Sequence, residues 1–135
     1  MRFVDTNVLL YSVSVATADH EKRSRALALL RSVDLAVSVQ VLQEFYVQAT
    51  RASRRDPLTH AQARGLIDLW TRFPTQPMTV EILTDALDIR ARHGFSYWDS
   101  AILAAALALG CDTLLTEDLS HGQRIDGLTI SNPFL

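Results

Sequence analysis

Short apolar runs alternate with longer amphipathic stretches along this chain, a pattern typical of strands separated by helices. The runs that are short and apolar enough for buried strands are Arg2–Val4, Leu35–Val37, Gln76–Met78, Asp112–Thr116 and Leu128–Ser131. Helical patterns lie between them, over residues 20–32, 39–51, 59–73, 79–93 and 96–109. Strands joined through helices run parallel, in a sheet that helices cover on both faces. The pattern therefore predicts an α/β domain with a central parallel sheet.

Local signals indicate where several of these helices begin and end. Ser38, Thr59 and Ser96 each precede a helical stretch, where a side-chain hydroxyl can accept a free N–H of the first turn. Gly94 follows another stretch, and glycine readily takes the left-handed conformation that ends a helix. These residues set the expected helix boundaries.

Length and composition fit one domain spanning residues 1–135. The chain has 135 residues, 48% hydrophobic and 21% charged, enough to bury a core. Cys111 is the only cysteine, so neither an internal disulfide nor a cysteine-based zinc site is expected. The N-terminus lacks a signal-peptide pattern, and the most apolar run, 101–110, is too short to cross a bilayer. We therefore expect a cytoplasmic protein with no membrane segment.

Charge is nearly balanced along the whole chain but unevenly placed. The 13 basic and 15 acidic residues give a net charge of −2, which by itself does not indicate a polyanionic partner. Lys22 is the only lysine, and an arginine band is formed by Arg51, Arg54, Arg55, Arg64 and Arg72. This arginine band could contact a nucleic-acid backbone, or it could be the solvated surface of a helical hairpin. The sequence leaves both interpretations open.

Two acidic residues directly follow predicted strands. Asp5 comes after Arg2–Val4. Asp118 comes after Asp112–Thr116, with Glu117 beside it. The carboxyl ends of parallel strands meet at one edge of a sheet, where ligands bind in α/β folds. Either acid could instead stabilise a turn, since Asp side chains bond to nearby backbone at strand ends.

Two further acids lie on predicted helices. Asp99, in the segment Ser96-Tyr-Trp-Asp, fits a capping box, in which the acid bonds back to the N–H of Ser96. The bulky Tyr97 and Trp98 beside it would also shield the carboxylate from open water. Glu44 lies beside the apolar stripe of its helix, where a solvated position is the simplest interpretation. Taken singly, neither acid requires a chemical role.

Bringing these four acids together would be costly without a cation. Two carboxylates about 4 Å apart repel by roughly 4 kcal/mol at an effective dielectric near 20, against a domain stability of roughly 5–15 kcal/mol. Such a cluster needs raised pKa values or a divalent cation. Ligands that are all oxygen favour Mg²⁺ or Mn²⁺ over zinc, and the four histidines show no metal-ligand spacing.

Four segments taken together resemble the PIN-domain ribonucleases. They are FVDTNVLLY, QEF in the helix after the second strand, SYWDSAILAAA and LLTEDLSHG. They follow one another in the order found in that family, and the resemblance covers nearly the whole chain. Within the family, they are most similar to the VapC-type toxins of toxin–antitoxin pairs. The resemblance implies a PIN-like three-layer fold and an endoribonuclease that depends on Mg²⁺ or Mn²⁺. It also implies an RNA substrate, a homodimer and a cognate antitoxin protein.

The same resemblance assigns four acidic catalytic residues by their positions in these segments: Asp5, Glu44, Asp99 and Asp118. Asp5 and Asp99 would be the main metal ligands. Glu44 and Asp118 would complete the pocket, either by binding the metal through water or by positioning the attacking water. Supporting polar groups would come from Thr6, Asn7, Ser96 and Thr116.

Two other functions remain open. A PIN-like fold could hold a metal ion or another protein without catalysis. A haloacid-dehalogenase-like phosphatase also has an Asp after its first strand, but it needs a second Asp two residues later. This chain has Asn7 there, and Lys22 is not suitably placed to supply the lysine of such a site. Both features disfavour the phosphatase.

Overall fold

The sheet is built from strands that lie far apart in the sequence. In the computed structural model, which describes residues 1–135, six strands pair in the order β3-β2-β1-β4-β6-β5. Their bounds are β1 Arg2–Val4, β2 Leu35–Ser38, β3 Thr75–Gln76, β4 Thr113–Leu115, β5 Arg124–Ile125 and β6 Leu128–Ser131. All neighbouring strands run parallel except β5 and β6. The predicted parallel sheet is confirmed, with one antiparallel pair at its edge.

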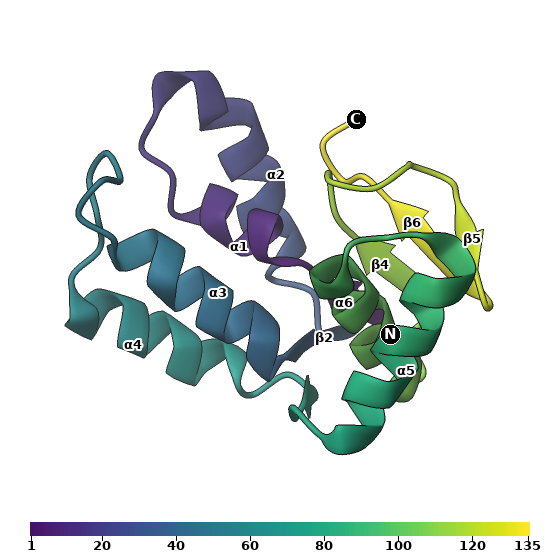
Figure 1. Cartoon of the computed structure of the whole chain (residues 1–135). Coiled ribbons are helices and arrows are strands. Elements are labelled where there is room, and N and C mark those ends of the chain that lie inside the picture. The colour runs from purple at the N-terminus through teal and green to yellow at the C-terminus, as the bar shows by residue number, and fades with distance from the viewer.

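Helices cover both faces of this sheet and give three layers (Figure 1). Their bounds are α1 Thr6–Ser12, a 3₁₀ turn η1 Thr17–Asp19, α2 His20–Leu29, α3 Val39–Thr50, α4 His60–Trp70, α5 Val80–His93 and α6 Tyr97–Ala108. The chain moves in one direction across the sheet from β1 to β3 and then returns to β4. Because such crossovers are right-handed, α1–α4 lie on one face and α5 and α6 on the other. None of the helices combines the length and apolar character needed to cross a membrane.

The expected helix boundaries are largely confirmed by hydrogen bonds at the helix ends. The hydroxyls of Ser38, Thr59 and Ser96 each accept a backbone N–H of the following first turn. Gly94 ends α5 with a left-handed φ of 75°. Local chemistry therefore determines where these helices begin and end, as the sequence predicted.

Two predictions at the ends of the sheet were wrong. The third strand is Thr75–Gln76, not Gln76–Met78, because Pro77 has no N–H with which to continue the ladder. The strand Arg124–Ile125 was missed altogether. It pairs with β6 through a turn at Asp126 and Gly127, whose φ angles of 51° and 89° fit a tight hairpin. An Asp-Gly pair between two apolar residues is the signal that could have revealed it.

The core holds α6 in a fixed position against the sheet. Residues 101–106 of this helix are all buried, and the helix contacts α5 as well as β2, β3 and β4. Four of those six residues are alanine, and the small side chain allows close approach on every side. The first turn of α6, which carries Asp99, is therefore fixed by a well-packed helix.

Candidate functional site

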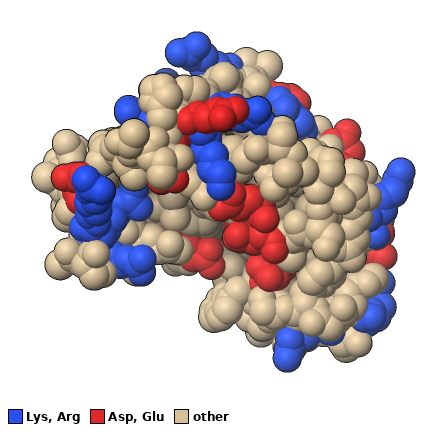
Figure 2. Space-filling model, turned by 90° about the horizontal axis from the view of Figure 1, so that it is seen from above, with Lys and Arg blue, Asp and Glu red and all other residues tan.

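The strand order opens a crevice between β1 and β4. These two strands are neighbours in the sheet, but the connections that follow them run in opposite directions. After β1 the chain crosses to β2 on one side, and after β4 it continues to β6 and β5 on the other side. Such a switch point, at the carboxyl ends of the strands, is where open α/β sheets bind ligands. A pocket of about 420 Å³ lies there, and we call it the acidic pocket. Figure 2 shows acidic side chains gathered in a hollow on this face of the molecule.

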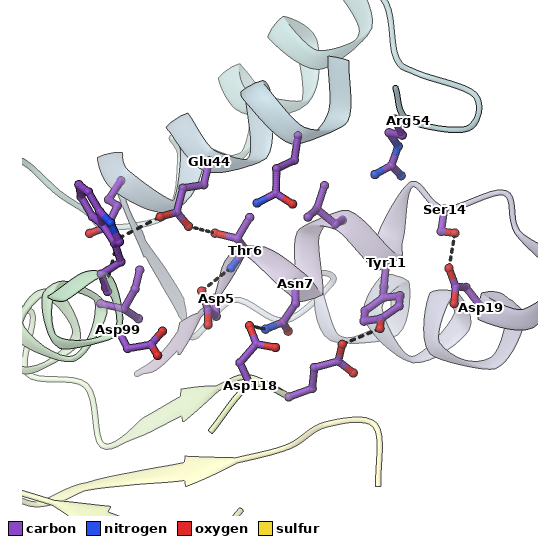
Figure 3. Close-up of a pocket in the computed structure, with 16 residues that line it drawn as sticks. Asp5, Thr6, Asn7, Tyr11, Ser14, Asp19, Glu44, Arg54, Asp99 and Asp118 are labelled. Carbon is purple, nitrogen blue, oxygen red and sulfur yellow. Dashed lines mark hydrogen bonds between the residues drawn. The ribbon is translucent and has the colours of Figure 1, made fainter. Parts of the chain in front are cut away.

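All four acids predicted from the sequence line the acidic pocket: Asp5, Glu44, Asp99 and Asp118. They come from the start of α1, the middle of α3, the first turn of α6 and the segment after β4 (Figure 3). The structure therefore brings together residues that lie far apart in the sequence, from Asp5 to Asp118.

Asp5 is the most buried of these acids and also caps α1. One carboxylate oxygen accepts the N–H of Thr6 at 2.7 Å, and the other accepts the hydroxyl of Thr116 at 2.8 Å. Burial raises the pKa of Asp5 to about 6, the two hydrogen bonds oppose this rise, and the charges of Asp118 and Glu44 add to it. Asp5 therefore begins helix α1 through its side chain and also lines the acidic pocket, where its chemical role stays a prediction.

Thr116 connects the acids on two neighbouring strands. Besides donating to Asp5, its hydroxyl accepts the side-chain amide of Asn7 at 3.0 Å and the N–H of Asp118 at 3.1 Å. The Asn7 amide also donates to the Asp118 carboxylate at 3.1 Å. Thr116 is fully buried, so its bond to Asp5 is shielded from water, whereas the bond between Asn7 and Asp118 is exposed. Thr116 and Asn7 thus contact the predicted acids directly.

Glu44 is half-buried and hydrogen-bonded, so the solvated position considered for it is wrong. Its carboxylate accepts the hydroxyl of Thr6 at 3.0 Å and the side-chain amide of Gln40 at 3.1 Å. The same Gln40 amide also reaches the carbonyl of Trp98 at 3.3 Å, which ties α3 to the start of α6. These bonds fix the Glu44 carboxylate at the wall of the acidic pocket.

The capping box predicted at the start of α6 is only half formed. The Ser96 hydroxyl accepts the N–H of Asp99 at 3.1 Å, but the Asp99 carboxylate does not bond back to the Ser96 N–H. Figure 3 shows this carboxylate pointing into the acidic pocket. Partial burial raises the pKa of Asp99, the Ser96 hydroxyl opposes the rise, and the charges of Asp118 and Glu44 add to it. Ser96 caps the helix and leaves the acid free for the pocket.

The donors in this pocket fit a hard divalent cation. Every candidate ligand is an oxygen, and the buried Oδ1 of Asn7 has no hydrogen-bond partner. No three acidic, histidine or cysteine side chains are arranged to hold one ion directly. The Glu44 carboxylate instead accepts hydrogen bonds from Thr6 and Gln40, and the Asp118 carboxylate accepts one from Asn7. An ion held by one or two carboxylates and by water, as is typical of Mg²⁺, is compatible with this arrangement.

The contacts of several residues beside the acidic pocket could not be predicted from the sequence. Glu117 accepts the Tyr11 hydroxyl at 2.5 Å and pairs with the Lys22 ammonium at 2.9 Å. Lys22 also donates to Tyr11 at 3.1 Å. Glu117 is thus neutralised by a cation 95 residues away, whereas the adjacent Asp118 faces Asn7. No local signal could have separated the roles of these two neighbouring acids.

The arginine band is divided among different surroundings. Arg54 lines the acidic pocket. Arg64 pairs with Asp68 at 3.1 Å on the exposed face of α4, and Arg72 borders a separate apolar groove. The members of the band therefore do not share one surface of the pocket.

This chain matches one protein-family model and the folds of several solved structures. The family model of the PIN domain matches residues 2–125. A toxin–antitoxin complex from Klebsiella pneumoniae superposes with a TM-score of 0.72 at 19% identity, over 98% of each chain. Mycobacterium tuberculosis VapC20, described as a sarcin–ricin loop cleaving toxin, gives 0.67 at 22% identity, over 87% of this chain and 92% of that one. VapBC2 from Rickettsia felis, bound to a promoter DNA fragment, gives 0.65 at 20% identity, over 97% of each. No curated protein matched significantly in sequence.

Proposed function

This chain belongs to the PIN domain family, and from that premise we propose that it is a metal-dependent endoribonuclease. The observation that carries the proposal is that four acids from four separate segments line one pocket at the switch point of the sheet. The likeness in fold to VapC20, a toxin described as cleaving the sarcin–ricin loop, supports RNA as the substrate. The proposed reaction is hydrolysis of an RNA phosphodiester bond.

Asp5 and Asp99 are the residues we propose to hold a Mg²⁺ or Mn²⁺ ion. When bound, such an ion polarises a phosphoryl oxygen, lowers the pKa of a coordinated water and offsets the developing negative charge. Asp5 binds a cation best when ionised, and its pKa of about 6 leaves it mostly ionised at neutral pH in spite of its burial. A bound cation would offset the cost of this buried negative charge.

Glu44 and Asp118 are proposed to orient the attacking water. Each carboxylate is fixed by a side-chain amide, from Gln40 in one case and from Asn7 in the other. Each keeps further lone pairs that can accept a hydrogen bond from water. As the water oxygen attacks phosphorus, the bond to the leaving oxygen breaks, the water loses a proton and the leaving oxygen gains one. Fixed acceptors lower the cost of orienting water for this step.

We further propose that the protein is the toxin of a toxin–antitoxin pair and acts in the cytoplasm as a homodimer. Support comes from neighbours of similar fold, which are described as toxin–antitoxin complexes from Klebsiella pneumoniae and Rickettsia felis. Expression of this chain alone should arrest growth, and co-expression with an adjacent antitoxin gene should relieve the arrest. Light scattering of the purified chain would test the homodimer.

Cleavage of RNA with and without metal tests the central proposal. Wild type should cleave RNA in Mg²⁺ or Mn²⁺, EDTA should abolish cleavage, and Asp5→Asn should lower it by at least about a hundredfold. Asp34→Asn is the matched control, because Asp34 lies outside the pocket in a surface pair with Arg2. Cleavage that persists in EDTA, or that Asp5→Asn leaves unchanged, would contradict the mechanism. Metal binding without any cleavage would favour the non-catalytic PIN-like module.

A further inference from the structure

One cation lines the acidic pocket, and it lies away from the metal-binding acids. Arg54 comes from the loop between α3 and α4 and is the only lysine or arginine among the residues that line the pocket. Figure 3 shows it at the opposite end from Asp99, beyond Asn7 and near Ser14. The one cation of the pocket therefore lies at the end away from Asp99, where Asp19 is also found.

The guanidinium of Arg54 has no acidic partner in the protein. Its Nε is buried and makes no hydrogen bond. Some other arginines are paired with acids at short range, as Arg64 is with Asp68 and Arg92 with Asp126. Asp19 also lines the pocket, but its carboxylate accepts the Ser14 hydroxyl at 2.7 Å and does not pair with Arg54. Because no acid in the protein neutralises it, this guanidinium keeps its charge and its donors for a ligand that carries acceptor oxygens.

The loop that carries Arg54 is held in place by the protein. The Arg54 N–H donates to the carbonyl of Arg51 at 3.1 Å, and the Leu58 N–H donates to the carbonyl of Ala49 at 2.8 Å. Leu58 also packs against the hydrophobic core. The base of the loop is thus closed, and Arg54 is presented to the pocket from a fixed turn.

We propose that Arg54 binds a phosphate of the RNA strand that flanks the phosphate being cleaved. This inference rests on the proposed function, which assigns the reacting phosphate to the end of the pocket that holds Asp5 and Asp99. An RNA strand lying along the pocket from that end meets Arg54 with a neighbouring phosphate. A guanidinium matches two phosphate oxygens with paired hydrogen bonds, which makes it well suited to this contact. Arg54, and not the arginine band as a whole, then sets how the strand is aligned for cleavage.

Binding of RNA to cleavage-silenced protein tests this proposal, with Arg55 as the matched control. Arg55 is the next residue in the same loop, is exposed and does not line the pocket. Fluorescence anisotropy would follow a labelled, unstructured single-stranded RNA of mixed sequence in Mg²⁺, with Asp5→Asn present in every protein. Adding Arg54→Gln should weaken binding by at least about tenfold and reduce the salt slope by about 0.7, as expected for one lost phosphate contact. Adding Arg55→Gln, which removes the same charge, should weaken binding less than about threefold.

The outcomes separate this inference from the proposed function. Arg54→Lys should restore part of the affinity, because it keeps the charge but loses the paired geometry. Equal effects of Arg54→Gln and Arg55→Gln would overturn the role of Arg54, while cleavage of the same RNA by wild type would leave the proposed function standing. A specific loss at Arg54 without cleavage by wild type would support an RNA site and contradict the endoribonuclease. Absence of RNA binding by Asp5→Asn protein would overturn the Arg54 contact.

Discussion

Replacing Asp5 by Asn should stabilise the metal-free protein at neutral pH, although it removes a proposed metal ligand. Asp5 is only 7% exposed, and burial is the main cause that raises its pKa from 3.8 to about 6. Hydrogen bonds from Thr116 and Thr6 are too weak to cancel this effect, and nearby acidic charges increase it. The folded state therefore binds the Asp5 proton more tightly than the unfolded state does.

The sign and size of the effect follow from these two pKa values. Between pH 3.8 and about 6 the folded state carries more proton than the unfolded state, so stability falls as pH rises through this window. Above it the cost stays constant, at roughly 3 kcal/mol, since each unit between the pKa values is worth about 1.4 kcal/mol. Roughly 0.5 kcal/mol of this cost is already present at about pH 4. Because Asn does not ionise, the variant should gain roughly 2.5 kcal/mol relative to wild type between about pH 4 and pH 7.5.

Urea unfolding in EDTA at these two pH values measures the difference directly. Comparing the two pH values cancels any pH-independent change in hydrogen bonding to Thr116 that the substitution causes. Asp34→Asn is a control of opposite sign, because the Arg2 side chain lowers the pKa of exposed Asp34, so that variant should lose relative stability as pH rises. A stability difference between Asp5→Asn and wild type that is the same at both pH values would refute the reasoning. Added Mg²⁺ or Mn²⁺ should then stabilise wild type more than the variant.

Other substitutions separate packing, capping and site chemistry. Asp99→Asn should also stabilise metal-free protein more at neutral than at acidic pH, as urea unfolding would show. Ser96→Ala should cost about 1 kcal/mol at acidic pH through the lost cap, and more at neutral pH, because the Ser96 hydroxyl also lowers the pKa of Asp99. Thr116→Val removes the hydroxyl that donates to Asp5 and should raise the pKa of Asp5 further. The pH at which metal-dependent cleavage begins should then move upward in a pH–rate profile. Phe45→Ala removes a fully buried ring that packs edge-on against Trp70, with 4.7 Å between the ring centroids. It should lower the free energy of unfolding by about 3–5 kcal/mol, seen as a lower urea midpoint with an unchanged slope.

Elements with strong local signals could be predicted from the sequence, and those with weak signals could not. The helix that begins after Ser38 and the one that ends at Gly94 depend on capping within one turn, so sequence placed them well. The strands Thr75–Gln76 and Arg124–Ile125 contain two residues each, too few for a periodic pattern. Their positions depend on the neighbouring strand, on Pro77 in one case and on the hairpin turn in the other.

The sequence by itself determined the class of fold and placed two acids, Asp5 and Asp118, at strand ends. Resemblance to a family, and not local pattern, singled out Glu44 and Asp99, because each has an ordinary helical explanation. Only the tertiary structure decided which groups meet each acid, since Thr116 and Asp5 are 111 residues apart and Lys22 and Glu117 are 95 apart. Those contacts depend on strand order and crossover direction, which bring distant segments to one edge of the sheet. For the same reason, only the fold distinguished Arg54, which lines the pocket, from the other members of the arginine band, which do not.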